Sequence, residues 1–247
     1  GDDDLLVAIY TAGDNIACPS KPCAQYISYS NDLGRSWTHF ADNPVLSHIV
    51  GDNRDPKVIW HAPTAKWIMA LYLSENSFGL FGSEDLKTWR GLSTVHVPGA
   101  TECPDLFPLP VDGDPKDVKW VFWAANGSYL VGTFDGQVFR AETGVLRADY
   151  GKNFYAAQTW DNIPEHDGRR LQIAWMAGGD YPGMPFNQQM SIPCELSLSR
   201  RTDGYRLIRR PVRELSALRG EHSTWNEVDL AHGKNPLRDV SADAFEV

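Results

Sequence analysis

One supersecondary unit recurs four times along the chain, and this repeat constrains the fold more than any other feature. Each copy joins a strand of small residues to a turn that contains an aspartate and is accompanied by an aromatic side chain. The turn acids, 53, 50 and 68 residues apart, are Asp32, Asp85, Asp135 and Asp203. β-Propellers repeat a four-stranded blade at about this period. The spacing therefore predicts an all-β propeller with about four blades in this chain.

Short β-rich runs bounded by Gly, Asp, Asn and Pro lie between these turns, whereas helical periodicity is nearly absent. A β-sandwich would also give short strands with turn signals, but it would not need the same turn four times. The first turn, residues 30–37, fits the pattern S-x-D-x-G-x-[ST]-W and resembles the Asp box of sialidases. We expect a structural role for such a turn, in which the aspartate accepts backbone N–H bonds and the tryptophan packs between strands.

Composition argues against several classes of partner. The 247 residues are 42% apolar, which is ample for a core, and their formal net charge is −9. Nucleic acids and anionic membranes favour clustered Lys and Arg, so we expect neither as a partner. No apolar run approaches the roughly 18 residues that span a bilayer. The seven histidines form no H-x-x-x-H pair, and we expect no metal and no cofactor.

Four cysteines, Cys18, Cys23, Cys103 and Cys194, are too few for a disulfide scaffold. None of them has the C-x-x-C spacing of a zinc site. Cys18 and Cys23 are the first and last residues of the segment "CPSKPC". They could form a disulfide that closes a small loop or remain two separate thiols, and the sequence leaves both alternatives open.

The propeller geometry selects candidate site residues, because the innermost strands of all blades converge at one end of the central axis. These strands begin near residues 53–58, 101–107 and 153–158. Their first residues, which we expect in one pocket, are Arg54, Asp55, Glu102, Cys103 and Tyr155.

Two carboxylates that face one ligand suit glycoside hydrolysis, where one acid holds a proton and another stays ionised. Arg54 should keep the neighbouring Asp55 charged, whereas Glu102, near that charge and under apolar walls, should hold its proton more readily. A structural alternative is that "RDP" and "CPD" are turns at the strand starts whose acids cap backbone N–H groups. The residues by themselves leave both interpretations open.

Five motifs in register favour the first interpretation, and they extend over nearly the whole chain. They are "NRDPKVIWH", "ECPDLFPLPVDG", "YLVGTFDGQVF", "DYGKNFYAAQTW" and "GRRLQIAWM". Together they resemble the motifs of glycoside hydrolase family 32, the invertase, inulinase and levanase family. The related arabinanases share the propeller fold but lack the Arg-Asp-Pro and Glu-Cys-Pro pair.

The resemblance implies a role for each candidate. Asp55 would bind the fructosyl hydroxyls and stabilise the transition state with Arg54 beside it, and Glu102 would be the general acid and then the base. Cys103, Tyr155 and Trp175 would line the fructosyl subsite. Asp105 is expected to be a turn or support residue.

The family's nucleophile lies in an amino-terminal W-M-N-D-P-N-G motif on the first blade of a five-bladed propeller, and these 247 residues contain no such string. Both ends of the chain look cut. We therefore expect blades two to five of the propeller over 1–239 and the start of a carboxy-terminal β-sandwich over 240–247. Because retaining hydrolysis needs that nucleophile, we expect the isolated chain to be inactive or very weak.

The sequence thus predicts a fragment of a retaining β-fructosidase acting on fructans or sucrose. The alternative from another class is a non-catalytic fructan-binding or structural propeller. The Gly- and Pro-rich stretch 178–190 should form a loop over the mouth. The family resemblance implies an extracellular or periplasmic protein, although these residues include no signal peptide, and an open propeller edge could pair with another chain.

Overall fold

The computed structural model describes a mostly β-stranded protein. The described residues are 5–14, 21–164, 166–179, 181–226, 231–233, 235–238 and 240–241. The chain divides into two compact units, 1–212 and 213–247. In the second unit, the 3-10 helix η2 spans Arg213–Leu218.

Two predictions fall largely outside the described residues. Cys18 is not described, so its predicted relation to Cys23 is not tested. Of the expected sandwich start at 240–247, only residues 240 and 241 are described. The domain bounds 1–239 and 240–247 therefore remain a prediction.

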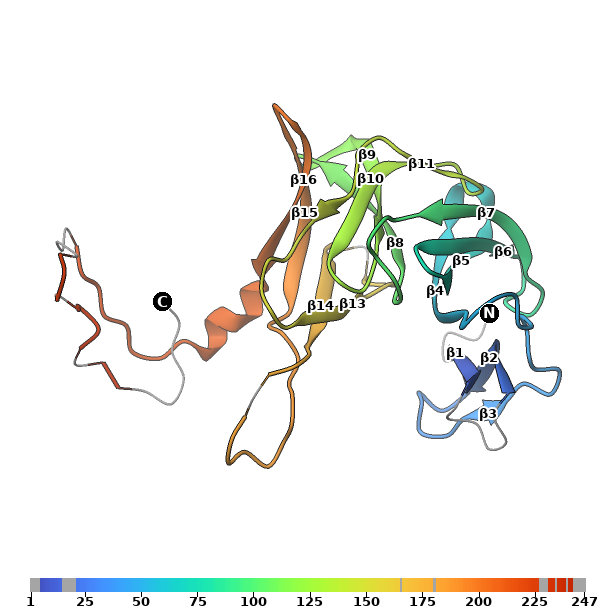
Figure 1. The fold of residues 1–247 in the computed structure, drawn as a ribbon, viewed down its shortest axis with the longest axis horizontal. Coiled ribbons are helices and arrows are strands. Elements are labelled where there is room, and N and C mark those ends of the chain that lie inside the picture. Colours follow the sequence, from blue (N-terminus) through green and yellow to red (C-terminus); the bar gives the residue numbers. More distant parts are fainter. Residues whose placement is uncertain are drawn as a thin grey trace. The chain divides into compact units, whose positions relative to one another are not determined.

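The first unit contains four consecutive antiparallel blades, as predicted (Figure 1). The first blade consists of β1 (Leu6–Asp14), β2 (Lys21–Ser30) and β3 (Thr38–His39). The second consists of β4 (Arg54–His61), β5 (Lys66–Ser74), β6 (Ser77–Ser83) and β7 (Arg90–His96), with the 3-10 turn η1 (Ala62–Thr64) between β4 and β5. The third consists of β8 (Asp105–Val111), β9 (Asp114–Trp123), β10 (Ser128–Phe134), β11 (Phe139–Ala141) and β12 (Leu146–Arg147). The fourth consists of β13 (Phe154–Thr159), β14 (Arg170–Met176), β15 (Cys194–Arg201) and β16 (Gly204–Pro211).

The first strands of the first three blades lie side by side, with β4 in contact with both β1 and β8. A parallel pairing of Val111 of β8 with Leu198 of β15 joins the third and fourth blades into one nine-stranded sheet. The strand starts that the sequence predicted near 53, 101 and 153 are observed at Arg54, Asp105 and Phe154. The propeller prediction is therefore confirmed at the level of strand order.

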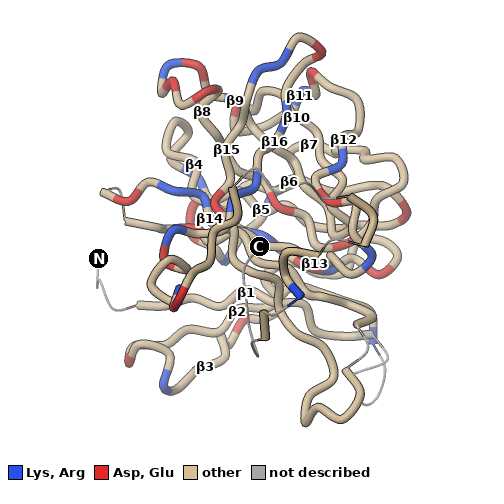
Figure 2. The backbone as a smooth tube through the Cα atoms, turned by 90° about the vertical axis from the view of Figure 1, so that its left-hand side faces the viewer, with Lys and Arg blue, Asp and Glu red and all other residues tan. Residues whose placement is uncertain are grey.

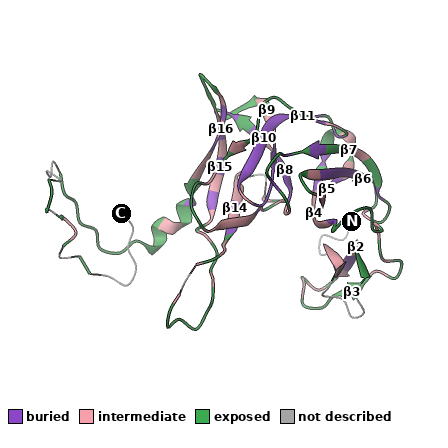
Figure 3. Cartoon of the chain, in the orientation of Figure 1, coloured by how far each residue is buried: buried purple, intermediate pink, exposed green. Residues whose placement is uncertain are grey.

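The core lies between the blades, and the end of β9 illustrates this, because its residues 120–123 are all apolar. Phe122 and Trp120 pack against the second blade, whereas Val121 and Trp123 pack toward the fourth. Successive side chains of a strand point to opposite faces, and both faces of an internal blade are covered. Figure 3 accordingly shows buried residues concentrated in β6, β8 and β10.

The substitution Phe122→Ala is expected to lower the free energy of unfolding by about 3–5 kcal/mol, because it leaves a cavity between two blades. The Phe122 ring is fully buried and lies 5.3 Å from Phe78 and 5.8 Å from Phe139, measured between ring centroids. Urea unfolding of the 247-residue chain measures this change in the free energy of unfolding, provided that the m-value is the same in wild type and variant. The control Tyr150→Ala, at an 83% exposed side chain, should change stability by no more than about 0.5 kcal/mol. Equal losses in the two variants would contradict this packing.

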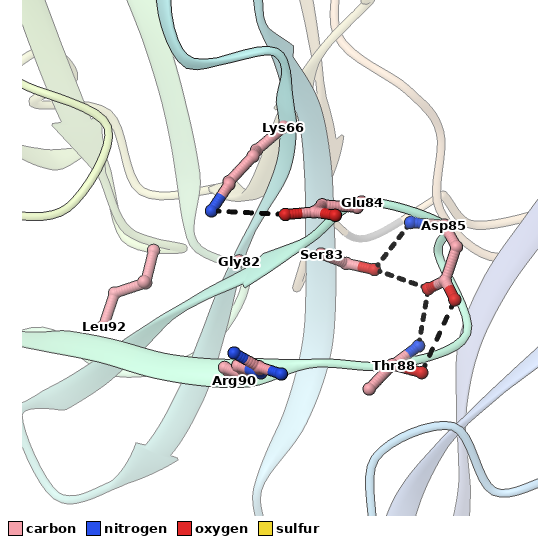
Figure 4. Close-up of a pocket in the computed structure, with 8 residues that line it drawn as sticks. All are labelled: Lys66, Gly82, Ser83, Glu84, Asp85, Thr88, Arg90 and Leu92. Carbon is pink, nitrogen blue, oxygen red and sulfur yellow. Dashed lines mark hydrogen bonds and ion pairs between the residues drawn. The ribbon is translucent and has the colours of Figure 1, made fainter.

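The second Asp turn shows how these turns are stabilised (Figure 4). The Asp85 carboxylate accepts backbone N–H bonds from Lys87 at 2.9 Å and Thr88 at 2.8 Å, and a hydroxyl bond from Ser83 at 3.1 Å. The Trp89 indole donates to the Leu86 carbonyl and is only 8% exposed. This is the structural role that the sequence predicted.

The other turns confirm that role with two differences. Asp32 and Asp135 each accept backbone N–H bonds from residues of their own turns. Trp37, expected between strands, is 46% exposed and immediately precedes the two-residue strand β3. The fourth acid, Asp203, forms an ion pair with Arg206 of β16.

Charges do not segregate along the described backbone. Figure 2 shows basic and acidic segments interspersed. Among the described residues, no helix has both the length and the apolar character that crossing a membrane requires.

Candidate active site

Asp55 is the second residue of β4 and has a strained backbone. Its φ of +61° lies in the left-handed region, which costs free energy for any residue with a Cβ. It sits in an irregularity of the β4–β5 ladder between Arg54 and Lys57. The Asp55 N–H donates to the Thr11 hydroxyl of β1 at 3.1 Å, so the first blade supports this conformation. β-Bulges of this kind occur beside active sites, where they redirect a side chain.

Glu102 and Cys103 precede β8 and share this strained conformation, with φ of +58° and +41°. The backbone N–H of Ala125 donates to the Glu102 carbonyl at 3.1 Å. The Gln158 amide of β13 donates to the carbonyls of Cys103 and Pro104 at 3.3 Å each. The segment is therefore held by the third and fourth blades together.

The structure brings the five predicted strand-start residues into one cluster. The Glu102 carboxylate accepts a hydrogen bond from the Arg54 guanidinium on one oxygen and from the Tyr155 hydroxyl on the other. The Asp55 carboxylate accepts the Cys103 backbone N–H at 3.0 Å. Residues from three blades, up to 101 positions apart in sequence between Arg54 and Tyr155, thus meet at one place.

The electrostatics of Glu102 differ from the sequence-based expectation. The hydrogen bonds from Arg54 and then from Tyr155 lower the pKa of Glu102, because both donors stabilise the carboxylate. Arg54 also forms the expected ion pair with Asp55, at 3.9 Å, but its hydrogen bond to a carboxylate goes to Glu102. The expectation that Glu102 holds its proton more readily is therefore wrong. Burial and the bond to Glu102 raise the pKa of Tyr155 to about 12, so its hydroxyl stays a donor.

The Cys103 thiol adds a second contact to Asp55. Its sulfur lies 3.6 Å from the same carboxylate oxygen that accepts the Cys103 N–H. Burial raises the pKa of the Cys103 thiol, and the nearby Asp55 charge acts in the same direction. The thiol is therefore protonated at neutral pH and acts as a donor rather than as a nucleophile.

The cluster is open to a ligand on one side. The side chains of Arg54, Asp55 and Glu102 are 30%, 31% and 27% exposed. Trp175 of β14 is 38% exposed and lies edge-on to Tyr155, with the ring centroids 6.4 Å apart. Within the described residues, no group of three His, Cys, Asp or Glu side chains is placed to hold a metal ion. The exposed chemistry is thus two carboxylates, a guanidinium, a phenol and an indole.

Sequence reasoning missed several supporting residues. The Tyr72 ring of β5 lies under the Arg54 guanidinium, 5.0 Å from ring centroid to Cζ. Thr11 and Gln158 support the two acid-bearing segments, as described above. The alternation of β5 places Tyr72 on a defined face, but no sequence signal identifies which strand lies opposite it.

The predicted loop 178–190 lies next to this cluster at its described residues. Trp175 forms an isolated β-bridge with Met190, and the Met176 N–H donates to the Gln189 carbonyl at 2.8 Å. The described part of the loop exposes apolar side chains, including Met184 at 59%.

Two cavities lie outside the pair of candidate acids, and the second adjoins the cluster because Met190, which pairs with Trp175, lines it. One of about 200 Å³ surrounds the second Asp turn and is lined by Lys66, Glu84 and Arg90 among others (Figure 4). Because Lys66 pairs with His61, this cavity is at the end of β4 opposite Arg54. The other, of about 460 Å³, is bounded by residues that include Phe154 and Met190. Neither cavity is lined by the two candidate acids.

Comparison with known proteins supports the family resemblance. Residues 1–211 match the model of the glycosyl hydrolases family 32 N-terminal domain. A levanase of Bacillus subtilis is 39% identical in an alignment that covers 100% of this chain and 39% of that protein. An extracellular exo-inulinase of Meyerozyma guilliermondii is 33% identical over 84% of this chain and 44% of that protein.

Solved structures agree with this assignment. The crystal structure of exo-inulinase from Aspergillus awamori superposes with a TM-score of 0.76 at 27% identity, covering 86% of this chain and 49% of that chain. The chain spans less than half the length of each of these relatives. On the family match over 1–211 and on these similarities, the chain belongs to glycoside hydrolase family 32.

Proposed function

We propose that the protein containing this chain hydrolyses β-fructofuranosidic bonds of fructans or sucrose with retention of configuration. The observation that carries the proposal is the Asp55–Glu102 cluster, in which two carboxylates from different blades both contact Arg54 and stay accessible. Paired carboxylates around one sugar ring are the groups that glycoside hydrolysis uses.

Glu102 is proposed as the general acid and then the general base. It protonates the glycosidic oxygen as the bond from that oxygen to the fructosyl carbon breaks and the nucleophilic carboxylate of the family's first blade bonds to that carbon, and the leaving sugar departs with the proton. In the second step Glu102 takes a proton from the water that attacks the fructosyl carbon and displaces that carboxylate. Arg54 and Tyr155 stabilise the carboxylate that remains after proton donation.

Asp55 is proposed to bind fructosyl hydroxyls and to stabilise the positive charge that develops on the sugar ring. The Cys103 N–H and thiol fix this carboxylate through one of its oxygens. Its other oxygen is available to sugar hydroxyls. Tyr155 and Trp175 supply the aromatic wall of the same subsite.

A retaining mechanism also needs a carboxylate that attacks the fructosyl carbon. The W-M-N-D-P-N-G motif that carries this nucleophile in the family does not occur within these 247 residues. We therefore propose that the isolated 247-residue chain releases little or no sugar, and that activity requires the nucleophile-bearing segment of the family.

Sugar release from sucrose, inulin and levan tests the proposal. The assay compares the isolated chain with a protein in which this chain is joined to a family first blade that carries the nucleophile motif. Fructose release by the joined protein alone is the expected result. Robust turnover by the isolated chain would refute the nucleophile argument, and fructan binding by the joined protein without turnover would favour a non-catalytic binder.

The substitution Tyr155→Phe is expected to move the alkaline limb of the kcat/KM profile of the joined protein to higher pH. A general acid must be protonated, so the rate falls as pH rises through the pKa of Glu102. The Tyr155 hydroxyl helps to lower that pKa, and removing this donor raises it. Tyr150→Phe, at an 83% exposed ring, is the control and should leave the profile unchanged. A limb that stays in place or moves to lower pH in Tyr155→Phe would contradict the assignment.

We also propose an extracellular or periplasmic location, in line with the relative that is named an extracellular exo-inulinase.

Self-association through an open propeller edge remains a prediction. Light scattering of the isolated chain across a concentration series tests it, and a constant monomer mass would contradict it.

A further inference from the structure

One fully buried carboxylate, Asp105 at the start of β8, contacts two other inner strands besides its own. Its Oδ1 accepts the Leu106 N–H at 2.8 Å, and its Oδ2 accepts the Thr159 N–H of β13 at 2.7 Å. The Lys57 ammonium of β4 lies 3.6 Å from the same Oδ2. Asp105 has 0% exposure and no access to a sugar. It therefore cannot act on substrate directly.

The charges around Asp105 form a balanced network. The Lys57 ammonium donates to the Thr159 carbonyl and lies 3.2 Å from Asp161, whose other oxygen is 2.6 Å from Arg170 of β14. Two cations thus face two anions. Burial raises the pKa of Asp105, and the Lys57 ammonium opposes that increase. Removing one member leaves a buried charge without its partner, which is strongly unfavourable.

Each network residue follows a candidate active-site residue by two to four positions in the chain. Lys57 follows Asp55 by two residues, Asp105 follows Glu102 by three, and Thr159 follows Tyr155 by four. One network residue therefore lies on each of the three strands that deliver the candidate residues.

Regular strand pairing resumes at or near the network in each strand. The β4–β5 register resumes at Lys57 after the irregularity at Asp55, and the β8–β9 register begins at Asp105. The β13–β14 irregularity lies between Tyr155 and Gln158, and Ala156 within it has a φ of +50°. Strained residues persist only where their surroundings fix them firmly.

Strand pairing does not supply this constraint between β4 and the other two strands. β4 belongs to a different sheet from β8 and β13, and no strand pairing of the described residues joins it to either. The side-chain network around Asp105 is a buried polar connection that ties the starts of these three strands together, beneath the more exposed contacts of Glu102 with Arg54 and Tyr155.

We propose that Lys57 and Asp105 are positioning residues, which set the separation of Asp55 and Glu102 from inside the propeller and thereby control the rate of glycosidic bond cleavage. This inference rests on the proposed function. A shift of about 1 Å in a reacting group can cost about 10²-fold in rate, so the network acts on kcat more than on substrate binding. A structural role alone would lower stability and leave kcat and KM of the folded protein unchanged.

The test compares Asp105→Asn, Lys57→Met and the double variant in the joined protein, with fructose release from sucrose as the assay. Each single variant is expected to lower kcat about 10- to 100-fold with KM within about threefold of wild type. The kcat of the double variant should fall by a smaller factor than the product of the two single-variant factors, because no unpaired buried charge remains. Lys119→Met is the matched control, because Lys119 forms a 2.7 Å ion pair with Glu142 on the third blade outside the site, and it should keep wild-type kcat and KM.

Wild-type kcat in the folded single variants would overturn the proposal, even if their melting temperatures fall. If the single variants do not fold, the double variant decides by the same criterion. If that also fails to fold, Lys57→Arg decides, where at least a fivefold loss of kcat at unchanged KM supports the proposal and wild-type kcat overturns it. Absence of fructose release by the wild-type joined protein would instead refute the proposed function, so the two failures are distinguishable.

Discussion

Glu102→Gln in the joined protein is expected to lower kcat/KM on sucrose by about 10²- to 10⁴-fold, the contribution of a positioned general acid. Glutamine has nearly the same shape, and its single amide oxygen can still accept the hydrogen bond from Arg54, while its NH2 group can donate to the Tyr155 hydroxyl oxygen. It cannot donate a carboxylic proton to the leaving oxygen. The loss would therefore come from proton transfer and not from collapse of the cluster.

The leaving group separates this role from a purely structural one. A fructoside with an acidic phenol as leaving group needs little protonation, so Glu102→Gln should slow the bond-breaking step on it much less than on sucrose. Glu142→Gln is the matched control, because Glu142 pairs with Lys119 on the third blade and should keep the wild-type rate. A wild-type rate of Glu102→Gln on sucrose would remove Glu102 from the mechanism.

Asp55→Asn is expected to lower kcat by about 10²- to 10³-fold, the usual loss when one preorganised electrostatic contact to the transition state is removed. The amide keeps the size of the side chain and an oxygen for the Cys103 N–H. It lacks the negative charge that stabilises a cationic sugar ring. The measurement is kcat on sucrose, with fructose affinity measured by calorimetry to detect lost hydroxyl contacts.

The same leaving-group comparison distinguishes Asp55 from Glu102. An acidic leaving group should not restore the rate of Asp55→Asn, because the missing charge acts on the sugar and not on the leaving oxygen. Asp52→Asn serves as the control in the same segment, since its side chain is 72% exposed, and its rate should stay within about threefold of wild type. Equal losses at Asp52 and Asp55 would indicate a general effect of charge near Arg54.

The blades were predictable from sequence because their turns repeat a local chemistry. Asp32, Asp85 and Asp135 bind backbone groups two to four residues away, and such short-range contacts leave a readable pattern. The meeting of Asp55 with Glu102 followed from that architecture, since inner strands converge in any propeller. These parts of the fold and site needed no information about individual side-chain directions.

The pairing of Arg54 was not predictable from sequence. Adjacent residues on a strand point to opposite faces, so the position of Arg54 next to Asp55 in the chain does not predict which carboxylate accepts its hydrogen bond. The left-handed φ of Asp55 redirects this segment further, and the guanidinium reaches Glu102 of the next blade. The direction of the Glu102 pKa shift depends on that contact. The sequence-based account therefore predicted the wrong direction for the pKa shift of Glu102.

The Asp105 network illustrates a second limit. The sequence assigned Asp105 a support role but did not identify Lys57 or Thr159 as its partners, because they lie 48 and 54 residues away on other blades. The partners of a buried charge depend on how separate sheets pack. The exposed Trp37 shows the reverse case, in which a residue of a recognised motif is not buried as the motif predicts.

A crystal structure of the joined protein with bound fructose tests the central claim most directly. We predict one fructose ring with hydroxyl oxygens within hydrogen-bond distance of the Asp55 carboxylate and with its anomeric oxygen facing Glu102. Fructose bound instead in the 460 Å³ cavity beside Phe154 and Met190, with Asp55 and Glu102 free of sugar, would contradict the account.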